Sequence, residues 1–228
     1  MFLAIRLFPS LLLMSTACKP AVEKIYENSF ELRAARELEA IGDTTGARYY
    51  LSRALRDVQA RDEAYNFLNK IAERKEKSGE CIDAKKTDLA INQYPRIRHK
   101  HLFQLAVCFE AAGDTAKALN SYNLSENAGS KQPQLYIRRA LLEERRGGKL
   151  LAHKDFQRAV ELNAEYPPAQ LSYALFLIRN GESVGLGKIT GMMQQRKPFY
   201  AEIIADAERN REGMVKAIAL QVETDGKK

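Results

Sequence analysis

The sequence predicts an all-α fold, an α-solenoid of about five helical hairpins followed by C-terminal capping helices. Two regularities carry this prediction. Glycines recur at Gly42, Gly79, Gly113, Gly147 and Gly181, and the last three intervals between them are 34 residues each. In four of these repeats an alanine follows the glycine by five residues, namely Ala47, Ala84, Ala118 and Ala152. A fixed period of this length is typical of stacked helical repeats.

Each repeat is expected to hold two antiparallel helices. The glycine ends the first helix, because it adopts the left-handed conformation that follows many helix C-termini. An acidic residue follows the glycine in four repeats and favours the start of the second helix: Asp43, Glu80, Asp114 and Glu182. The fifth repeat has Leu186 where the others have alanine. That last hairpin is therefore expected to be degenerate.

The N-terminal end is expected to be a signal peptide over residues 1–17. Arg6 lies in a short basic region, an apolar stretch follows, and small residues precede Cys18. The apolar stretch is too short to span a membrane comfortably. This end resembles a bacterial lipoprotein signal, which implies a lipid anchor on Cys18, although Ser15 departs from the usual leucine. Lys19 favours the outer membrane. The alternative is a soluble secreted protein that begins with cysteine.

The remainder of the chain divides into four parts. Residues 18–24 are expected to be a tether, 25–195 the solenoid, 196–224 capping helices and 225–228 a mobile tail. The apolar pattern changes after Pro198, where two short helices or one broken helix are expected. In the second repeat, three extra residues are expected near Pro95, which ends a helix. A single solenoid of this length buries a continuous core without a second domain.

The third and fourth repeats resemble the tetratricopeptide family. The third, HLFQLAVCFEAAGDTAKALNSY, has the family's core pattern at Leu102, Leu105, Ala106, Phe109, Ala118 and Tyr122. The fourth has it at Tyr136, Ala140, Ala152, Phe156 and Ala159. Arg139 and Glu143 occupy two positions that the family usually makes apolar or aromatic. The resemblance implies a fold and a protein-binding role, and it implies no particular partner.

In that family the first helix of each repeat lines a concave inner wall. The resemblance assigns six apolar residues to this wall: Phe103, Val107, Ile137, Leu141, Leu171 and Leu175. A helix that is apolar on two faces is covered on both. We therefore expect a groove in the C-terminal half that docks a partner helix or an apolar extended segment. The alternative is that the C-terminal helices, residues 198–222, fill this groove internally.

Two cysteines remain if Cys18 carries a lipid. Cys81 is expected at the start of the second helix of repeat two, and Cys108 near the end of the first helix of repeat three. These ends lie at the same rim of a solenoid, and disulfides persist in exported proteins. A Cys81–Cys108 disulfide is the prediction, and two buried thiols are the alternative.

The sequence offers no catalytic constellation, cofactor motif or metal site. His99 and His101 lack a carboxylate or cysteine at ligand spacing, so surface basicity explains them better. The formal net charge of +7 is spread among acidic residues, which favours a charged helix face over a nucleic-acid surface. The chain is therefore interpreted as a non-catalytic envelope scaffold with a protein partner and a membrane anchor.

This combination resembles tetratricopeptide lipoproteins that help assemble type IV pilus secretins at the outer membrane. The alternative function is an accessory subunit of an envelope enzyme or transport complex, in cell-wall synthesis, division or export.

Overall fold

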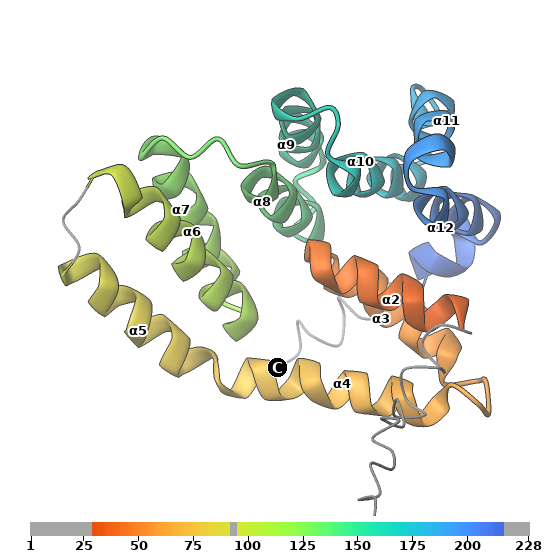
Figure 1. Cartoon of the computed structure of the whole chain (residues 1–228), viewed down its shortest axis with the longest axis horizontal. Helices are drawn as coiled ribbons and strands as arrows, with labels where there is room; N and C mark the ends of the chain where they lie inside the picture. Colours follow the sequence, from red (N-terminus) through yellow and green to blue (C-terminus); the bar gives the residue numbers. More distant parts are fainter. Residues whose placement is uncertain (1–28, 92–94, 217–228) are drawn as a thin grey trace, which may run out of the picture.

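The computed structural model describes residues 29–91 and 95–216 of the 228-residue chain, and this part is all-α without a strand (Figure 1). The predicted signal peptide, Cys18, the tether and the C-terminal tail lie outside the described residues. The helices are α2 (Phe30–Ile41), α3 (Thr44–Ala54), α4 (Arg61–Glu76), α5 (Ser78–Ile91), α6 (Pro95–Ala112), α7 (Thr115–Asn127), α8 (Pro133–Arg145), α9 (Lys149–Leu162), α10 (Pro167–Asn180), α11 (Leu186–Arg196) and α12 (Pro198–Arg209).

Three pairs of consecutive helices form closely packed hairpins: α2 with α3, α6 with α7, and α8 with α9. The glycines predicted to end the first helix of these pairs, Gly42, Gly113 and Gly147, all have positive φ. Gly181 ends α10 in the same way, with φ of 75°. Two of the predicted acids cap the next helix, because Asp43 accepts a hydrogen bond from the Gly46 backbone N–H and Asp114 from that of Lys117.

The second predicted repeat is not a hairpin, which corrects the expectation drawn from Gly79. That glycine lies in the first turn of α5, and it is absent from the left-handed glycines of the described chain. Helices α4 and α5 follow one another along the edge of the molecule with little mutual contact, and α5 packs on α6 instead (Figure 1). Ala84, predicted to be a crossing point, is accordingly exposed, whereas Ala47, Ala118 and Ala152 are buried.

The predicted irregularity of the second repeat lies partly outside the described residues, at positions 92–94. Pro95 does not end a helix but begins α6. A proline is well suited to the first turn of a helix, because the backbone N–H that it lacks would have no partner there. The fifth pair, α10 and α11, makes a looser contact than the preceding hairpin, and Leu186 begins α11.

The two ends of the described chain meet, so the array closes on itself (Figure 1). Helix α12 packs on α10 and α11, and it also contacts the first hairpin. Asp206 of α12 accepts hydrogen bonds from Tyr50 Oη at 3.1 Å and Arg53 Nη1 at 2.6 Å. Tyr200 Oη donates to Glu37 at 2.9 Å. The capping region predicted over 196–224 therefore also joins the last helices to the first.

A buried ion cluster joins the first hairpin to the fourth and fifth helix pairs. Arg179 Nη1 of α10 lies 2.9 Å from Asp43 Oδ2, and its Nη2 lies 2.7 Å from Glu144 Oε2. The side chains of Arg179 and Asp43 are only 8% and 3% exposed. Burial by itself lowers the pKa of Arg179, but the charges of Glu144 and Asp43 outweigh burial and raise it. The guanidinium therefore stays charged and holds both carboxylates.

Arg139 also pairs with two carboxylates of neighbouring helices. It lies at a position that the tetratricopeptide family usually makes apolar or aromatic. It makes two hydrogen bonds to Asp155, at 2.7 and 2.8 Å, and also contacts Glu126. Partial burial by itself would raise the pKa of Glu126. The hydrogen bond and the positive charge of Arg139 have the larger, opposite effect, so the pKa of Glu126 lies below its usual value. Arg139 thus connects α8 to both α7 and α9 through charged hydrogen bonds rather than apolar packing.

Candidate binding pocket

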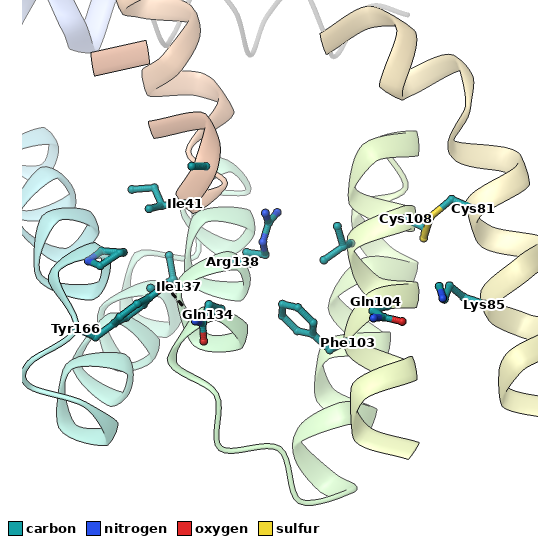
Figure 2. A pocket seen from close by; sticks show the side chains of 13 residues that line it. Ile41, Cys81, Lys85, Phe103, Gln104, Cys108, Gln134, Ile137, Arg138 and Tyr166 are labelled. Atoms are coloured by element: carbon teal, nitrogen blue, oxygen red, sulfur yellow. Dashed lines mark hydrogen bonds between the residues drawn. A yellow bond between two sulfur atoms is a disulfide. The ribbon is translucent and has the colours of Figure 1, made fainter. Parts of the chain in front are cut away.

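A half-open pocket of about 430 Å³ lies on the inner side of the closed array (Figure 2). This volume is in the range of small-ligand sites, about 300–1,000 Å³. Helices α2, α5, α6 and α8 and the start of α10 contribute its walls. The lining residues are Ala40, Ile41, Cys81, Lys85, Phe103, Gln104, Val107, Cys108, Gln134, Ile137, Arg138, Tyr166 and Pro168.

The apolar part of the pocket is formed mainly by α6 and α8. Phe103 and Val107 are four residues apart on α6 and therefore share one face of that helix. Ile137 lies on the facing helix α8, and Ile41 ends α2 beside it (Figure 2). Phe103 and Val107 are half-buried, whereas Ile137 is 2% exposed. Phe103 and Val107 are therefore the accessible apolar side chains that α6 brings to the pocket, and Ala40, Tyr166 and Pro168 add accessible surface from α2 and the start of α10.

Polar groups surround this apolar surface. Gln134 Nε2 donates a hydrogen bond to Tyr166 Oη at 3.0 Å, which fixes both side chains at one side of the pocket. Gln104 lies on the α6 side and is exposed, as is Gln134. Amide side chains offer both donors and acceptors, so this border can satisfy the backbone groups of a bound segment.

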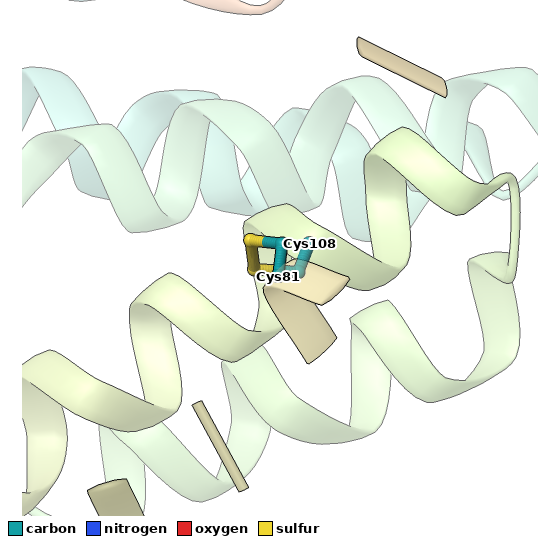
Figure 3. The surroundings of a disulfide bond; sticks show 2 residues. All are labelled: Cys81 and Cys108. Carbon is teal, nitrogen blue, oxygen red and sulfur yellow. A yellow bond between two sulfur atoms is a disulfide. The ribbon is translucent and has the colours of Figure 1, made fainter. Parts of the chain in front are cut away.

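Helix α5 forms one wall and is joined to α6 by a disulfide between Cys81 and Cys108 (Figure 3). The two Cα atoms are 5.7 Å apart, and 27 positions separate them in sequence. Cys81 is exposed, and Cys108 is 3% exposed. Ile82 and Leu89 of α5 are partly buried against the core, and the helix packs on α6, so apolar contacts contribute to holding it. The disulfide adds a covalent attachment of this wall to that packing.

Arg138 brings a positive charge to the α8 side. Its Nη1 lies 3.2 Å from Glu110 Oε2, and the same carboxylate lies 3.7 Å from Arg145 Nη2 through its other oxygen. Tyr122 Oη also donates to Glu110, at 2.8 Å. Burial and then the charge of Glu110 raise the pKa of the Tyr122 hydroxyl, which keeps it a neutral donor. One carboxylate is thus shared by two guanidinium groups and a phenol.

The structure separates the six residues predicted to line the groove into two sets. Phe103, Val107 and Ile137 lie together in the pocket. Leu141 is 3% exposed and lines a second cavity of about 90 Å³ with Gly42 and Asp43. Leu171 and Leu175 are fully buried.

The last three residues are therefore closed to a partner in this structure. Of the segment 198–222, which was the predicted alternative filling, the described part includes α12, and α12 packs on α10 together with α8, α9 and α11. Leu141 shares its cavity with the turn between α2 and α3.

Several lining residues were not identified from the sequence, chiefly Ile41, Lys85, Arg138 and Tyr166. Ile41 comes from a helix whose position depends on ring closure, which no local pattern reports. Lys85 comes from α5, and the prediction of its disulfide did not include the packing of α5 on α6 that brings Lys85 to the pocket. Arg138 had a detectable signal, because it immediately follows Ile137 in a helix whose positions were assigned to the inner wall. Its charge was instead interpreted as part of a solvated helix face.

Within residues 29–91 and 95–216, no group of three or more His, Cys, Asp or Glu side chains is placed to hold a metal ion. His153 lies 3.2 Å from Tyr173 Oη and 3.7 Å from Glu182, in a contact between α9 and the end of α10. The helices of this described part include none that is long and apolar enough to cross a membrane.

Comparison of the chain with known protein families, curated proteins and solved structures gives no match. The pocket is therefore interpreted from its own geometry.

Proposed function

We propose that this chain is a non-catalytic protein-binding scaffold of the bacterial cell envelope, built on a tetratricopeptide-type array. The observation that carries the proposal is the half-open apolar pocket at Phe103, Val107 and Ile137, with a polar border. Apolar surface combined with a few polar groups in a concave site is the usual composition of a binding site. A partner's apolar segment docks there, and the polar border orients it.

The proposal includes an outer-membrane anchor through lipidated Cys18, and a role in type IV pilus or secretin assembly as the most specific form. From Cys18 to Ser29 the chain reaches at most about 40 Å when fully extended. The start of α2 would then remain within that distance of the membrane surface. The resembling lipoproteins and the signal-like N-terminus support this part.

Photocrosslinking in intact cells tests the docking site. Benzoylphenylalanine at position 104, on the exposed border of the pocket, is expected to form a discrete protein adduct. The same group in place of Val58, which is 79% exposed and does not line the pocket, is the control. Adding Phe103→Glu is expected to abolish the adduct, because a charge replaces the apolar surface.

If Phe103→Glu lowers the melting temperature of the protein, Val107→Thr provides a milder change of the same surface. Identical adducts from positions 104 and 58, or adducts that persist in both pocket variants, would contradict docking at this site.

Lipidation has its own test. Cells that express the chain are expected to incorporate labelled palmitate into it, and the Cys18→Ser variant is expected to lose the label and leave the membrane fraction. Globomycin, which blocks lipoprotein signal cleavage, should cause an unprocessed form of the wild-type chain to accumulate. Membrane association that is unchanged in Cys18→Ser would rule out the anchor.

A further inference from the structure

We propose that one end of the molecule contacts an anionic lipid surface. Three exposed side chains, Leu150, Leu151 and Val184, form an apolar tip that enters the lipid, and the lysines beside them face the headgroups. This contact is separate from the docking pocket and does not require a lipid on Cys18. The gathering of exposed apolar side chains, the charges around them and their place at the ends of helices support it.

Exposed apolar side chains gather at the turn between α8 and α9. Leu150, Leu151 and Val184 are 69%, 54% and 89% exposed, and they are three of the seven large apolar side chains that are exposed in the described part of the chain. Leu150 and Leu151 lie in the first turn of α9, directly after Gly147 and Gly148. Single exposed apolar side chains are ordinary, whereas a group of them marks a contact surface.

Val184 belongs to the same end of the molecule, although it follows a different helix. Arg179 in the last turn of α10 makes hydrogen bonds of 2.9 and 2.7 Å to Glu144 in the last turn of α8. The two helices therefore end side by side, which places the loop after α10 next to the turn between α8 and α9. His153 of α9 also lies 3.7 Å from Glu182, two residues before Val184.

The chain around the two leucines is basic. Residues 145–154 contain four lysines and arginines and no acidic residue. Lys149 immediately precedes the leucines, and Lys154 shares their face of α9, because it follows Leu150 by four residues and Leu151 by three. Both lysines are exposed, and none of the ion pairs among residues 29–91 and 95–216 involves either of them.

The acidic side chains at this end do not cancel that charge. Glu182 is the exposed one, at 48%. The others are held by arginines and are at most 17% exposed: Asp43, Glu110, Glu143, Glu144 and Asp155. The exposed cations Arg146, Lys149 and Lys154 therefore outnumber the exposed carboxylate. An approaching surface meets a positive excess around the apolar tip.

A lipid surface suits the apolar tip better than a protein partner does. None of its three side chains lines either of the cavities described above, and all three lie where helices begin or end. Protein interfaces are usually poor in lysine. Leucines bordered by lysines are instead the composition of segments at a membrane interface, where apolar side chains enter the lipid and basic ones attract anionic headgroups.

The proposed anchor permits this contact without being needed for it. Arg179 also pairs with Asp43, so the turn between α2 and α3 lies at the same end as the apolar tip, and Ser29 lies at the other end of α2. Helix α2 has 12 residues and is about 18 Å long. The reach of about 40 Å from Cys18 to Ser29 exceeds this length. A chain anchored at Cys18 can therefore place the apolar tip on the membrane.

Tryptophan fluorescence tests the contact, because the chain contains no tryptophan of its own. The protein is expressed from residue 19, so that neither a lipid nor the apolar signal-like segment binds vesicles. The emission of Leu150→Trp should shift to shorter wavelength with vesicles that contain phosphatidylglycerol, but not with pure phosphatidylcholine vesicles. Val58→Trp, at a position 79% exposed between α3 and α4, is the control and should show no shift. No shift at position 150, or equal shifts at both positions, would overturn the proposal.

Cosedimentation with the same vesicles repeats the test without an added aromatic side chain. Leu150→Ser combined with Leu151→Ser should weaken vesicle binding about tenfold or more. Lys149→Gln combined with Lys154→Gln should weaken it about tenfold, and so should a rise in salt concentration. Lys70→Gln combined with Lys77→Gln removes the same charge from exposed positions near the end of α4 and should leave binding unchanged.

Other results would assign the apolar tip differently. Vesicle binding that neither double variant at the tip weakens, or that is as strong with pure phosphatidylcholine, would overturn the lipid contact. Self-association of the wild-type chain without vesicles, abolished by Leu150→Ser with Leu151→Ser, would assign the surface to a second copy and overturn it as well. The substituted side chains at the tip are exposed, so a thermal melt should show no loss of stability.

Discussion

Replacing Arg179 with methionine is expected to lower the free energy of unfolding by about 3–5 kcal/mol, because it leaves two carboxylates without their shared cation. The side chains of Asp43 and Glu144 are 3% and 17% exposed, so water cannot fully replace the guanidinium. The lost contact also joins α10 to the turn between α2 and α3. The variant should therefore weaken ring closure as well as overall stability.

Thermal and urea unfolding measure the effect. For a protein of this size, each kcal/mol shifts the melting temperature by roughly 2–4 °C, so a fall of about 10 °C is expected. Arg158→Met is the matched control, because Arg158 is half-exposed and its partners, Glu161 on its own helix and the Tyr136 hydroxyl of α8, leave no buried carboxylate behind when it is removed. That change should cost no more than about 0.5 kcal/mol.

A compensating variant separates unpaired charge from lost packing. Combining Arg179→Met with Asp43→Asn and Glu144→Gln removes the buried negative charges, while asparagine at position 43 still caps α3. The triple variant should recover part of the stability lost by Arg179→Met alone. A single variant that unfolds like Arg158→Met, or a triple variant that is less stable still, would contradict the view that buried charge pairing closes the ring.

The positions of most helices could be predicted from the glycine ladder, because helix termination is a local property. Gly42, Gly113, Gly147 and Gly181 all adopt the left-handed conformation that the ladder implied. Gly79 fits the spacing almost as well, yet it lies inside the first turn of α5. A glycine permits a left-handed turn without requiring one. The packing of α5 on α6, which a spacing does not report, determined the outcome here.

Ring closure could not be predicted from the sequence, because its contacts join residues far apart in the chain. Tyr50 and Asp206 are separated by 156 positions, and Arg179 and Asp43 by 136. A repeat pattern defines each helix relative to its neighbours, while small rotations between repeats add up to decide whether the ends meet. The apolar character of α8 and α10 on two faces did indicate that both faces are covered. What covers them depended on this accumulated curvature.

The candidate site could be predicted only in part, because the repeat period places some of its residues and not others. Phe103, Val107 and Ile137 come from neighbouring repeats, whose relative position the period determines, and they share the pocket. Lys85 and Ile41 come from elements whose positions the period does not determine. Lys85 therefore could not be recognised from periodicity, whereas Arg138 follows Ile137 on a helix whose position the period determines.

Removing the disulfide with Cys81→Ser and Cys108→Ser is expected to lower the free energy of unfolding by about 3.5 kcal/mol in the chain-entropy model, given the 27-residue separation. The local effect should be larger on α5 than elsewhere. The apolar side chains Ile82 and Leu89 of that helix are only partly buried against the core, and α4 gives it little support. Without the covalent link, α5 should open at a lower free energy than α6 or α8, which bury apolar side chains.

Hydrogen exchange followed by mass spectrometry measures this directly. Peptides from α5 should exchange much faster after reduction of the wild-type chain, while peptides from α8 and α9 should change little. The double serine variant should already show fast exchange in α5 and should not respond to the reducing agent. Unchanged protection of α5 after verified reduction would contradict the attachment role of the disulfide.

The functional consequence follows from the place of α5 in the pocket. If α5 opens, the pocket loses one wall, while Phe103 and Val107 remain on α6. Reduction should then weaken the photocrosslinked adduct at position 104 without abolishing it. An adduct unchanged after verified reduction would mean that the surface of α6 is enough for docking. A complete loss would mean that docking requires the α5 wall as well.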